Sequence, residues 1–281
     1  MISSDEIRRF AGFQKMDPMI VEKDYILGCY LHFICKNSDV KKNWVFKGGT
    51  CLKKCYFEKY RFSEDLDFTV RKAFSKEELT NIIQNINLWV QDETGIRFDV
   101  REFVIEVIED DYGKESFEAR IYYRGPWQYR GSPPAIRIHV NRDEVLYFPQ
   151  EKLPIFHSYS DKKDLPGTYI IAYSLEEILA EKLRAFSGQR KYTVSRDIYD
   201  IFHLHSAMEE LSKTLAGFEA KCAVKGISLA GIDIESISKR QAEFKENWQN
   251  NLEYLVPENL HIAFDDAWKV SINLLGQAIK H

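Results

Sequence analysis

The sequence predicts a mixed α/β N-terminal half followed by an all-helical C-terminal half. Two observations indicate this fold class. Short apolar runs typical of strands alternate with helical patterns up to about residue 166, and helical patterns dominate from there to residue 281. We therefore expect an α/β domain over residues 1–166 and a helical domain over residues 167–281, with Pro166-Gly167 at the change of character.

Each half can be divided into elements by its apolar periodicity and its turn residues. Strands are expected at residues 44–46, 65–70, 98–108, 116–123, 135–140 and 168–172. Helices are expected at residues 18–35, 50–57 and 75–91, and in the C-terminal half at residues 174–187, 195–207, 208–222, 234–250 and 260–278. Two helices begin with a capping box, formed by Ser75 with Glu78 and by Ser174 with Glu177.

Composition excludes several classes of protein. The 281 residues are 44% hydrophobic, which suffices for a sizeable core, and the net charge of −4 argues against a uniformly basic nucleic-acid binder. No apolar run is long enough to cross a bilayer, and the N-terminus lacks the apolar core of a signal peptide. Five cysteines without metal-ligand spacing fit free thiols, so we expect a cytoplasmic protein.

Two acids in the stretch KGGTCLKKCYFEKYRFSEDLDF, residues 47–68, indicate a cation site. Asp65 and Asp67 alternate with Leu66 and Phe68, which is typical of a half-buried strand with both acids on one face. Carboxylates side by side repel each other unless a cation lies between them. The pair therefore predicts a divalent cation, Mg²⁺ or Mn²⁺.

The glycine pair upstream predicts a phosphate-binding turn. Gly48, Gly49 and Thr50 open a helical segment, where free backbone N–H groups favour phosphate. Alone, Gly-Gly-Thr is usually a turn and Asp-x-Asp is usually surface charge. Together, a phosphate cradle and a cation clamp are what metal-assisted chemistry on a nucleoside triphosphate requires.

This stretch resembles the first motif of the polymerase-β-like nucleotidyltransferase superfamily, and more closely that of the AbiEii/AbiGii/MenT toxin family. The resemblance rests on the glycine pair, Arg61, Ser63 and residues 65–68. It implies a polymerase-β-like mixed sheet and an enzyme that transfers a nucleoside monophosphate from an NTP. It also implies a toxin of a bacterial toxin–antitoxin or abortive-infection system, with a cognate antitoxin. The implied nucleotide-binding residues are Lys47, Gly48, Gly49, Thr50, Arg61 and Ser63.

Lys182 lies within the apolar stripe of the helix expected at residues 174–187. A lysine facing the core needs an anionic partner, and both a triphosphate and a core carboxylate fit. Further along, Asp197 suits the first turn of a helix, whereas Asp200 faces the packed side.

The stretch from residue 176 to residue 204 resembles the later motifs of the same family. The resemblance implies that Lys182 contacts the phosphates and that Asp197 or Asp200 assists the base or the acceptor. It implies Arg190 and Arg196 as supporting cations.

The chain departs from the superfamily at the strand expected to carry a third carboxylate. That strand reads Ile-Arg-Ile-His-Val, so His139 takes the place of the acid, with Asp143 as a substitute if the register is shifted. Histidine binds metals or accepts protons, but magnesium prefers oxygen. A weakened catalyst, a two-acid mechanism and a manganese preference stay open, as does a half-buried histidine without a role.

An arginine-rich stretch is the candidate acceptor surface. Between residues 120 and 142 there is no acid, and tyrosines are interleaved with the basic residues. Arginine beside aromatic rings binds phosphates and stacks on bases, although a strand–loop–strand with solvent-facing arginines has the same pattern. The family resemblance implies an RNA acceptor, such as the 3′ end of a tRNA, and we expect Arg120, Arg124, Trp127, Arg130 and Arg137 to contact it.

Two rival functions stay open at the sequence level. A transferase that modifies a small molecule, such as an aminoglycoside, or a protein side chain would use the same nucleotide chemistry. A regulator that binds NTP and a partner protein without turnover is made credible by His139.

Overall fold

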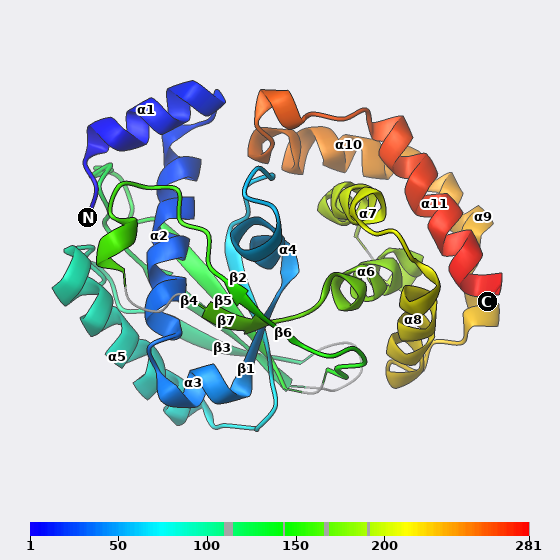
Figure 1. The fold of residues 1–281 in the computed structure, drawn as a ribbon, viewed down its shortest axis with the longest axis horizontal. Coiled ribbons are helices and arrows are strands. Elements are labelled where there is room, and N and C mark those ends of the chain that lie inside the picture. Colours follow the sequence, from blue (N-terminus) through cyan, green and yellow to red (C-terminus); the bar gives the residue numbers. More distant parts are fainter. Residues whose placement is uncertain (110–114, 143, 166–168, 190–191, 281) are drawn as a thin grey trace. The chain divides into compact units, whose positions relative to one another are not determined.

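The computed structural model describes residues 1–109, 115–142, 144–165, 169–189 and 192–280. The chain forms two compact units, one of Met1–Glu144 with Glu151–Ala172 and one of Val145–Gln150 with Tyr173–His281 (Figure 1). A mixed sheet with helices precedes a helical part, so the predicted fold class is confirmed. The domain change expected at Pro166-Gly167 lies outside the described residues.

The N-terminal unit is built on a seven-stranded sheet with the order β3-β4-β5-β2-β1-β7-β6. Its strands are β1 (Trp44–Lys47), β2 (Asp65–Val70), β3 (Val104–Glu109), β4 (Glu115–Tyr122), β5 (Ala135–Asn141), β6 (Glu151–Pro154) and β7 (Tyr169–Ala172). β2 pairs in parallel with β5 and β1 with β7, and the other neighbours are antiparallel. β6 was not predicted, and the strand expected from residue 98 begins only at Val104.

The helices of this unit are α1 (Ser4–Gln14), α2 (Pro18–Ile34), α3 (Ser38–Asn43), α4 (Gly48–Cys51) and α5 (Lys76–Thr94). α4 continues as a π-helix, Leu52–Tyr56. α2 is apolar around most of its circumference and is buried accordingly, in contact with α5, β2 and β5. On the sheet, Leu66 and Phe68 are fully buried, which leaves the alternate residues of β2 on the opposite face.

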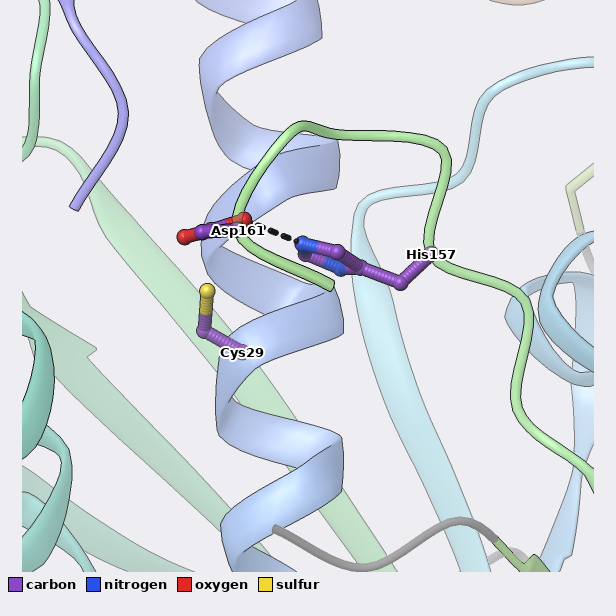
Figure 2. A group of neighbouring side chains, drawn as sticks. All are labelled: Cys29, His157 and Asp161. Atoms are coloured by element: carbon purple, nitrogen blue, oxygen red, sulfur yellow. Dashed lines mark hydrogen bonds and ion pairs between the residues drawn. The ribbon is translucent and has the colours of Figure 1, made fainter. Parts of the chain in front are cut away.

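A buried polar cluster connects α2 to the π-helix and to the loop after β6. Lys54 pairs with Asp24 at 2.7 Å, and Tyr159 donates its hydroxyl to the same carboxylate at 3.0 Å. Beside this pair, His157 Nε2 lies 2.8 Å from Asp161 Oδ1, and the Cys29 thiol lies next to both groups (Figure 2). The cluster therefore attaches the π-helix, which follows the glycine pair in sequence, to α2.

All regular secondary structure in the described part of the C-terminal unit is helical. Its helices are α6 (Leu175–Arg184), α7 (Ser195–Ala207), α8 (Ser212–Val224), α9 (Ile234–Lys239), α10 (Gln241–Asn251) and α11 (Phe264–Lys280). The helix expected at 234–250 is thus two helices, with a break at Arg240. Phe186, Phe244 and Trp268 form an aromatic core with ring centroids 5.3 to 5.6 Å apart.

Val145–Gln150 belongs to this second unit although it precedes β6 in sequence. The buried Glu177 carboxylate accepts the backbone N–H groups of Tyr147 and Phe148, at 3.3 and 2.6 Å, and pairs with Lys221 at 2.6 Å. No helix in the described ranges is both long enough and apolar enough to span a membrane.

Candidate active site

β2 carries the two aspartates at the centre of the site. Its buried residues Leu66 and Phe68 hold the strand in the core, so Asp65 and Asp67 project together from the opposite face. Thr50, from α4, donates its hydroxyl to the backbone oxygen of Asp65 at 2.5 Å. The segment with the glycines is thereby joined to the acid strand.

The geometry around Asp65 fits a cation. Burial and the neighbouring charge of Asp67 raise the pKa of the Asp65 carboxyl. Its Oδ1 is buried without a hydrogen-bond partner, and the guanidinium of Arg137 is 3.8 Å away. An oxygen without a donor beside a second carboxylate is an arrangement that a divalent ion would satisfy.

Both glycines are required by close approach of side chains from neighbouring elements. Gly48 has a φ of +80°, and a Cβ there would strike the Asp67 carboxylate. A Cβ at Gly49 would collide with the guanidinium of Arg61, which is buried and donates to the backbone oxygen of Phe62 at 3.0 Å. Lys47, buried at the end of β1, lies opposite Asp67 in the sheet register.

Ser63 completes the glycine turn from the loop before β2. Its hydroxyl would lie 3.2 Å from a Cβ at Gly49, so the serine lines the same turn as Arg61. Of the six residues that the resemblance assigns to the nucleotide, all therefore lie on or around the β1–α4 turn and the start of β2. Together, α4 and the π-helix that continues it run from Gly48 to Tyr56, which agrees with the helix expected at 50–57 to within two residues at either end.

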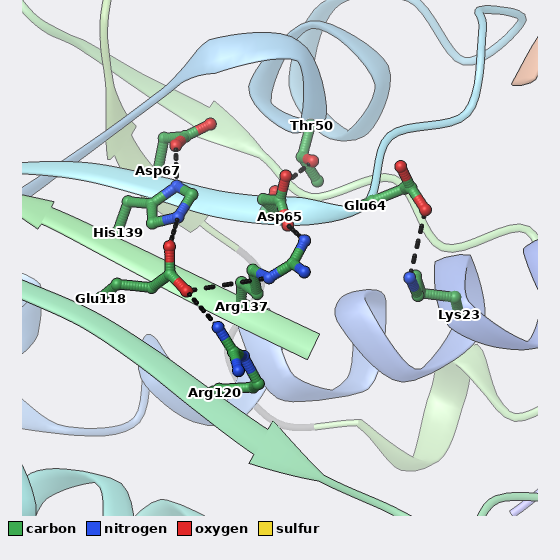
Figure 3. A network of polar contacts seen from close by, with 9 residues as sticks. All are labelled: Lys23, Thr50, Glu64, Asp65, Asp67, Glu118, Arg120, Arg137 and His139. Carbon is green, nitrogen blue, oxygen red and sulfur yellow. Dashed lines mark hydrogen bonds and ion pairs between the residues drawn. The ribbon is translucent and has the colours of Figure 1, made fainter. Parts of the chain in front are cut away.

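The face of the sheet that carries Asp65 and Asp67, called the acid face below, has two rows of charged side chains. They come from three neighbouring strands, β2, β5 and β4 (Figure 3). In the first row, His139 on β5 lies directly between Asp67 on β2 and Glu118 on β4. Its Nδ1 is 3.0 Å from Asp67 Oδ1, and its Nε2 is 2.9 Å from Glu118 Oε2. The second row runs from Asp65 to Arg137 and Arg120, which both contact Glu118 Oε1, at 3.8 and 3.2 Å.

The two carboxylates of the first row control the charge of His139. Burial opposes the imidazolium form, but the hydrogen bonds and charges of Asp67 and Glu118 outweigh it and raise the pKa of His139 to about 9. Burial likewise raises the pKa of Glu118, but His139 and the arginines outweigh it, so that pKa is lowered. The metal-free site thus holds an imidazolium between two carboxylates at neutral pH.

The metal-free protein is expected to lose stability as His139 loses its proton. Because the pKa of His139 is raised from 6.5 to about 9 by folding, its contribution is complete below 6.5 and disappears as the pH rises through 9. Urea unfolding of wild type and His139→Gln at about pH 6 and about pH 9.5 measures this contribution. Wild type should be more stable than His139→Gln at about pH 6 but not at about pH 9.5. An advantage independent of pH would contradict the charge assigned to His139.

Lys182 has carboxylate partners within the C-terminal unit. Its Nζ lies 2.7 Å from Asp197 Oδ1 and 2.7 Å from Asp200 Oδ2, both on α7. The Asp200 side chain is fully buried, so a core carboxylate does meet this lysine, one of the two partners expected. Arg196 is half-buried in the first turn of α7, and Arg190 lies outside the described residues.

The arginine-rich stretch divides into two groups. Arg120 and Arg137 lie on the acid face, in the second row. Arg124, Trp127 and Arg130 follow β4 in the loop, where Arg124 Nη1 donates to the backbone of Tyr129 at 2.9 Å and Arg130 is exposed. Among the interleaved tyrosines, Tyr122 and Tyr123 are buried, so they are not available for stacking on bases.

Two polar groups of the N-terminal unit escape prediction from sequence. Glu118 and Arg120 alternate along β4 with the buried residues Phe117, Ala119 and Ile121. This alternation predicts that Glu118 lies on the polar face of the strand, but it does not indicate a contact with His139. The other group is the buried pair of Asp24 and Lys54, because helical spacing places both residues on apolar elements without showing that they meet.

A second group of potential metal ligands lies in the buried polar cluster formed by α2 and the loop after β6. The ligand atoms of Cys29, His157 and Asp161 are all within 4.8 Å of one another. Thiol, imidazole and carboxylate suit zinc rather than magnesium. Asp161 already accepts from His157 and from the Tyr25 hydroxyl, at 2.8 and 2.7 Å, and burial together with Lys54 lowers the pKa of His157. This cluster therefore differs from the acid face in the type of its ligands and in the metal that they suit.

Comparisons with known proteins give one family match and several similar solved structures. Residues 33–270 match the family described as nucleotidyl transferase AbiEii toxin, type IV toxin–antitoxin system. Among solved structures, the chain is similar to JHP933 from Helicobacter pylori, at 15% identity and a TM-score of 0.58, with 94% of each chain covered. It is also similar to MenT4, a nucleotidyltransferase toxin from Mycobacterium tuberculosis, at 17% identity and a TM-score of 0.57, over 100% of this chain and 99% of that one. Both likenesses concern the fold, and comparison with curated proteins gave no match.

Proposed function

We propose a reaction and an acceptor for this chain on the premise that it belongs to the AbiEii nucleotidyl transferase toxin family. Membership makes it a nucleotidyltransferase of a type IV toxin–antitoxin system, with an NTP substrate, and implies an antitoxin partner. Beyond the family, we propose that the chain transfers a nucleoside monophosphate to RNA, at the 3′ end of a tRNA. The observation that carries the proposal is the pair Asp65 and Asp67 facing the glycine turn.

The glycine turn and its surroundings are proposed to hold the triphosphate. Close approach of Gly48 to Asp67 and of Gly49 to Arg61 leaves backbone N–H groups and a guanidinium side by side. Thr50 and Ser63 are polar neighbours of the same turn. Lys182 is also proposed to contact the phosphates, with Asp197 or Asp200 assisting the base or the acceptor and Arg190 and Arg196 as supporting cations.

Asp65 and Asp67 are proposed to hold magnesium or manganese, for which the unpartnered Oδ1 of Asp65 is one oxygen ligand. When bound, the ions supply positive charge that favours the attacking and leaving oxygens of an in-line displacement. In the reaction, the acceptor hydroxyl oxygen forms a bond to the α-phosphorus and its proton is released to solvent. The bond between the α-phosphorus and the oxygen that bridges to the β-phosphorus breaks, and pyrophosphate leaves with that oxygen. A cation such as Lys182 at the phosphates would contribute about 3 kcal/mol to the transition state.

An anionic acceptor is supported by the two arginines in the second row. Arg120 and Arg137 have side chains 37% and 48% exposed, so they can contact phosphate from solvent while still touching Glu118. Exposed Arg130, with Arg124 and Trp127 in the loop, extends the basic surface. A cationic small-molecule acceptor would meet repulsion at these arginines.

A second candidate, an NTP-binding regulator without turnover, is supported by one contact. His139 engages Asp67 directly, and this contact would keep one carboxylate from a metal ion unless the ion displaces it. Such a regulator would bind NTP without forming product.

One labelling experiment tests the proposed function. Pure protein is incubated with Mg²⁺ or Mn²⁺, each α-labelled NTP in turn and total bacterial RNA, beside the Asp65→Ala/Asp67→Ala variant. Label in tRNA-sized RNA with wild type alone is the expected result. Label in protein or in small molecules would exclude an RNA acceptor, and NTP binding without any label would favour the regulator.

A further inference from the structure

The first row on the acid face contains a histidine whose two ring nitrogens face two different carboxylates. Nδ1 faces Asp67 at 3.0 Å and Nε2 faces Glu118 at 2.9 Å. The side chain of His139 is 31% exposed and that of Glu118 16%, so Glu118 lies deeper. The imidazole ring separates the two carboxylates, and one ion cannot reach both while the ring stays in place.

Glu118 is itself held in one orientation. Its Oε1 faces Arg120 at 3.2 Å and Arg137 at 3.8 Å, which leaves Oε2 directed at His139. A carboxylate fixed by cations on one oxygen and by an imidazole on the other has little freedom to rotate. In metal sites, a histidine ligand regularly donates its second ring N–H to such a carboxylate, which fixes the tautomer and the ring plane.

Building on the proposed function, we propose that His139 is a nitrogen ligand of the metal ion held by Asp67, through Nδ1. Glu118 acts as a positioning residue by accepting the Nε2 hydrogen. Binding exchanges the Nδ1 proton for the ion, and the proton leaves to solvent. Asp67 and His139 would hold the ion between them in place of their present hydrogen bond.

The consequence is a change in metal preference. Magnesium requires oxygen ligands, whereas manganese and later transition metals accept imidazole. With Asp65, Asp67 and His139, the site offers two carboxylates and one nitrogen, so it should select Mn²⁺ over Mg²⁺. The Glu118–His139 pair thus determines the metal, and the two aspartates provide the charge.

The test measures metal binding to the full-length, metal-free protein by calorimetry, without NTP. Wild type should bind Mn²⁺ more than about tenfold more tightly than Mg²⁺, and Glu118→Gln should weaken Mn²⁺ binding about 10- to 100-fold. Glu106→Gln is the matched control, because Glu106 lies opposite Glu118 in the same register, on β3, without a contact to His139. It should leave Mn²⁺ affinity unchanged.

His139→Asp is the variant with the opposite expected effect. A third carboxylate should raise Mg²⁺ affinity and remove the preference for Mn²⁺. Electron spin-echo spectra of bound Mn²⁺ should show coupling to a histidine nitrogen in wild type and none in His139→Asp. If this variant does not fold, the comparison of Glu118→Gln with Glu106→Gln carries the test.

Two outcomes would overturn the inference: no preference for Mn²⁺ in wild type, or equal losses in Glu118→Gln and Glu106→Gln. These outcomes are distinct from failure of the proposed function. Mn²⁺ bound through His139 in a protein that labels no acceptor would retain the metal site and reject the transferase reaction on RNA. Labelled RNA together with spectra of bound Mn²⁺ that show no coupling to a histidine nitrogen would retain the transferase reaction and reject His139 as a metal ligand.

Discussion

Asp65→Asn is expected to abolish nucleotide transfer while it stabilises the metal-free protein. Loss of one carboxylate removes a metal ligand, and charge stabilisation by a catalytic metal amounts to several kcal/mol. At about 1.4 kcal/mol per tenfold change in rate, the loss should be about 10³-fold or more. Labelling of RNA under single-turnover conditions measures it.

The stabilising effect follows from the state of the Asp65 carboxyl. Burial and the charge of Asp67 raise its pKa, so the ionised carboxylate destabilises the folded protein above that pKa. A neutral amide removes this repulsion, so we expect the free energy of unfolding at neutral pH to rise. Added metal should reverse the order, because only wild type gains stability from binding it.

Glu64→Gln is the matched control for this prediction. Glu64 neighbours Asp65 in sequence and pairs with Lys23 at 3.2 Å on a part-exposed surface. This variant should keep full activity and change stability by at most about 1 kcal/mol. Full transfer by Asp65→Asn, or an equal loss in Glu64→Gln, would show that Asp65 is no metal ligand.

The strand that bears these acids shows what the sequence can predict. The alternation of Asp65 and Asp67 with Leu66 and Phe68 predicts both the strand and its polar face, because burial of one face determines the direction of the other. The mixed sheet followed by helices is predictable for the same reason, since each period of apolar residues specifies one kind of element.

Contacts between elements are the part that sequence could not supply. The meeting of His139 with Glu118 depends on the register between β4 and β5, which pattern alone does not determine. The choice between phosphate and carboxylate for Lys182 stayed open because it depends on how α6 packs against α7. Short elements were missed as well: β6 has only four residues, too few for a periodic signal.

Asp24→Asn is expected to destabilise the protein by about 3–5 kcal/mol, the range found when one partner of a buried ion pair is removed. The side chains of Asp24 and Lys54 are 6% and 4% exposed, and their charged atoms are 2.7 Å apart. Without the carboxylate, the Lys54 ammonium stays buried beside Lys53, whose pKa burial and neighbouring cations already lower to about 8. Urea unfolding at neutral pH measures the change.

Two further variants show whether the loss of stability comes from the Asp24–Lys54 pair or would follow from any substitution in α2. Lys23→Met removes the neighbouring, part-exposed pair with Glu64 and should cost at most about 1 kcal/mol. Asp24→Asn combined with Lys54→Met removes the Lys54 ammonium together with its carboxylate partner and should recover most of the loss. A cost in Asp24→Asn no greater than in Lys23→Met would contradict the role of the pair.

The pair also connects the stability of the core to the geometry of the site. Lys54 lies in the π-helix that continues directly from the glycine turn, and its backbone oxygen accepts the N–H of Phe156 at 2.6 Å. When Asp24 no longer holds Lys54, the turn at Gly48 loses one of its attachments to α2. We therefore expect Asp24→Asn to weaken NTP binding at temperatures where the protein is still folded, although Asp24 contacts neither Asp65 nor Asp67 in the hydrogen bonds and ion pairs of the described residues.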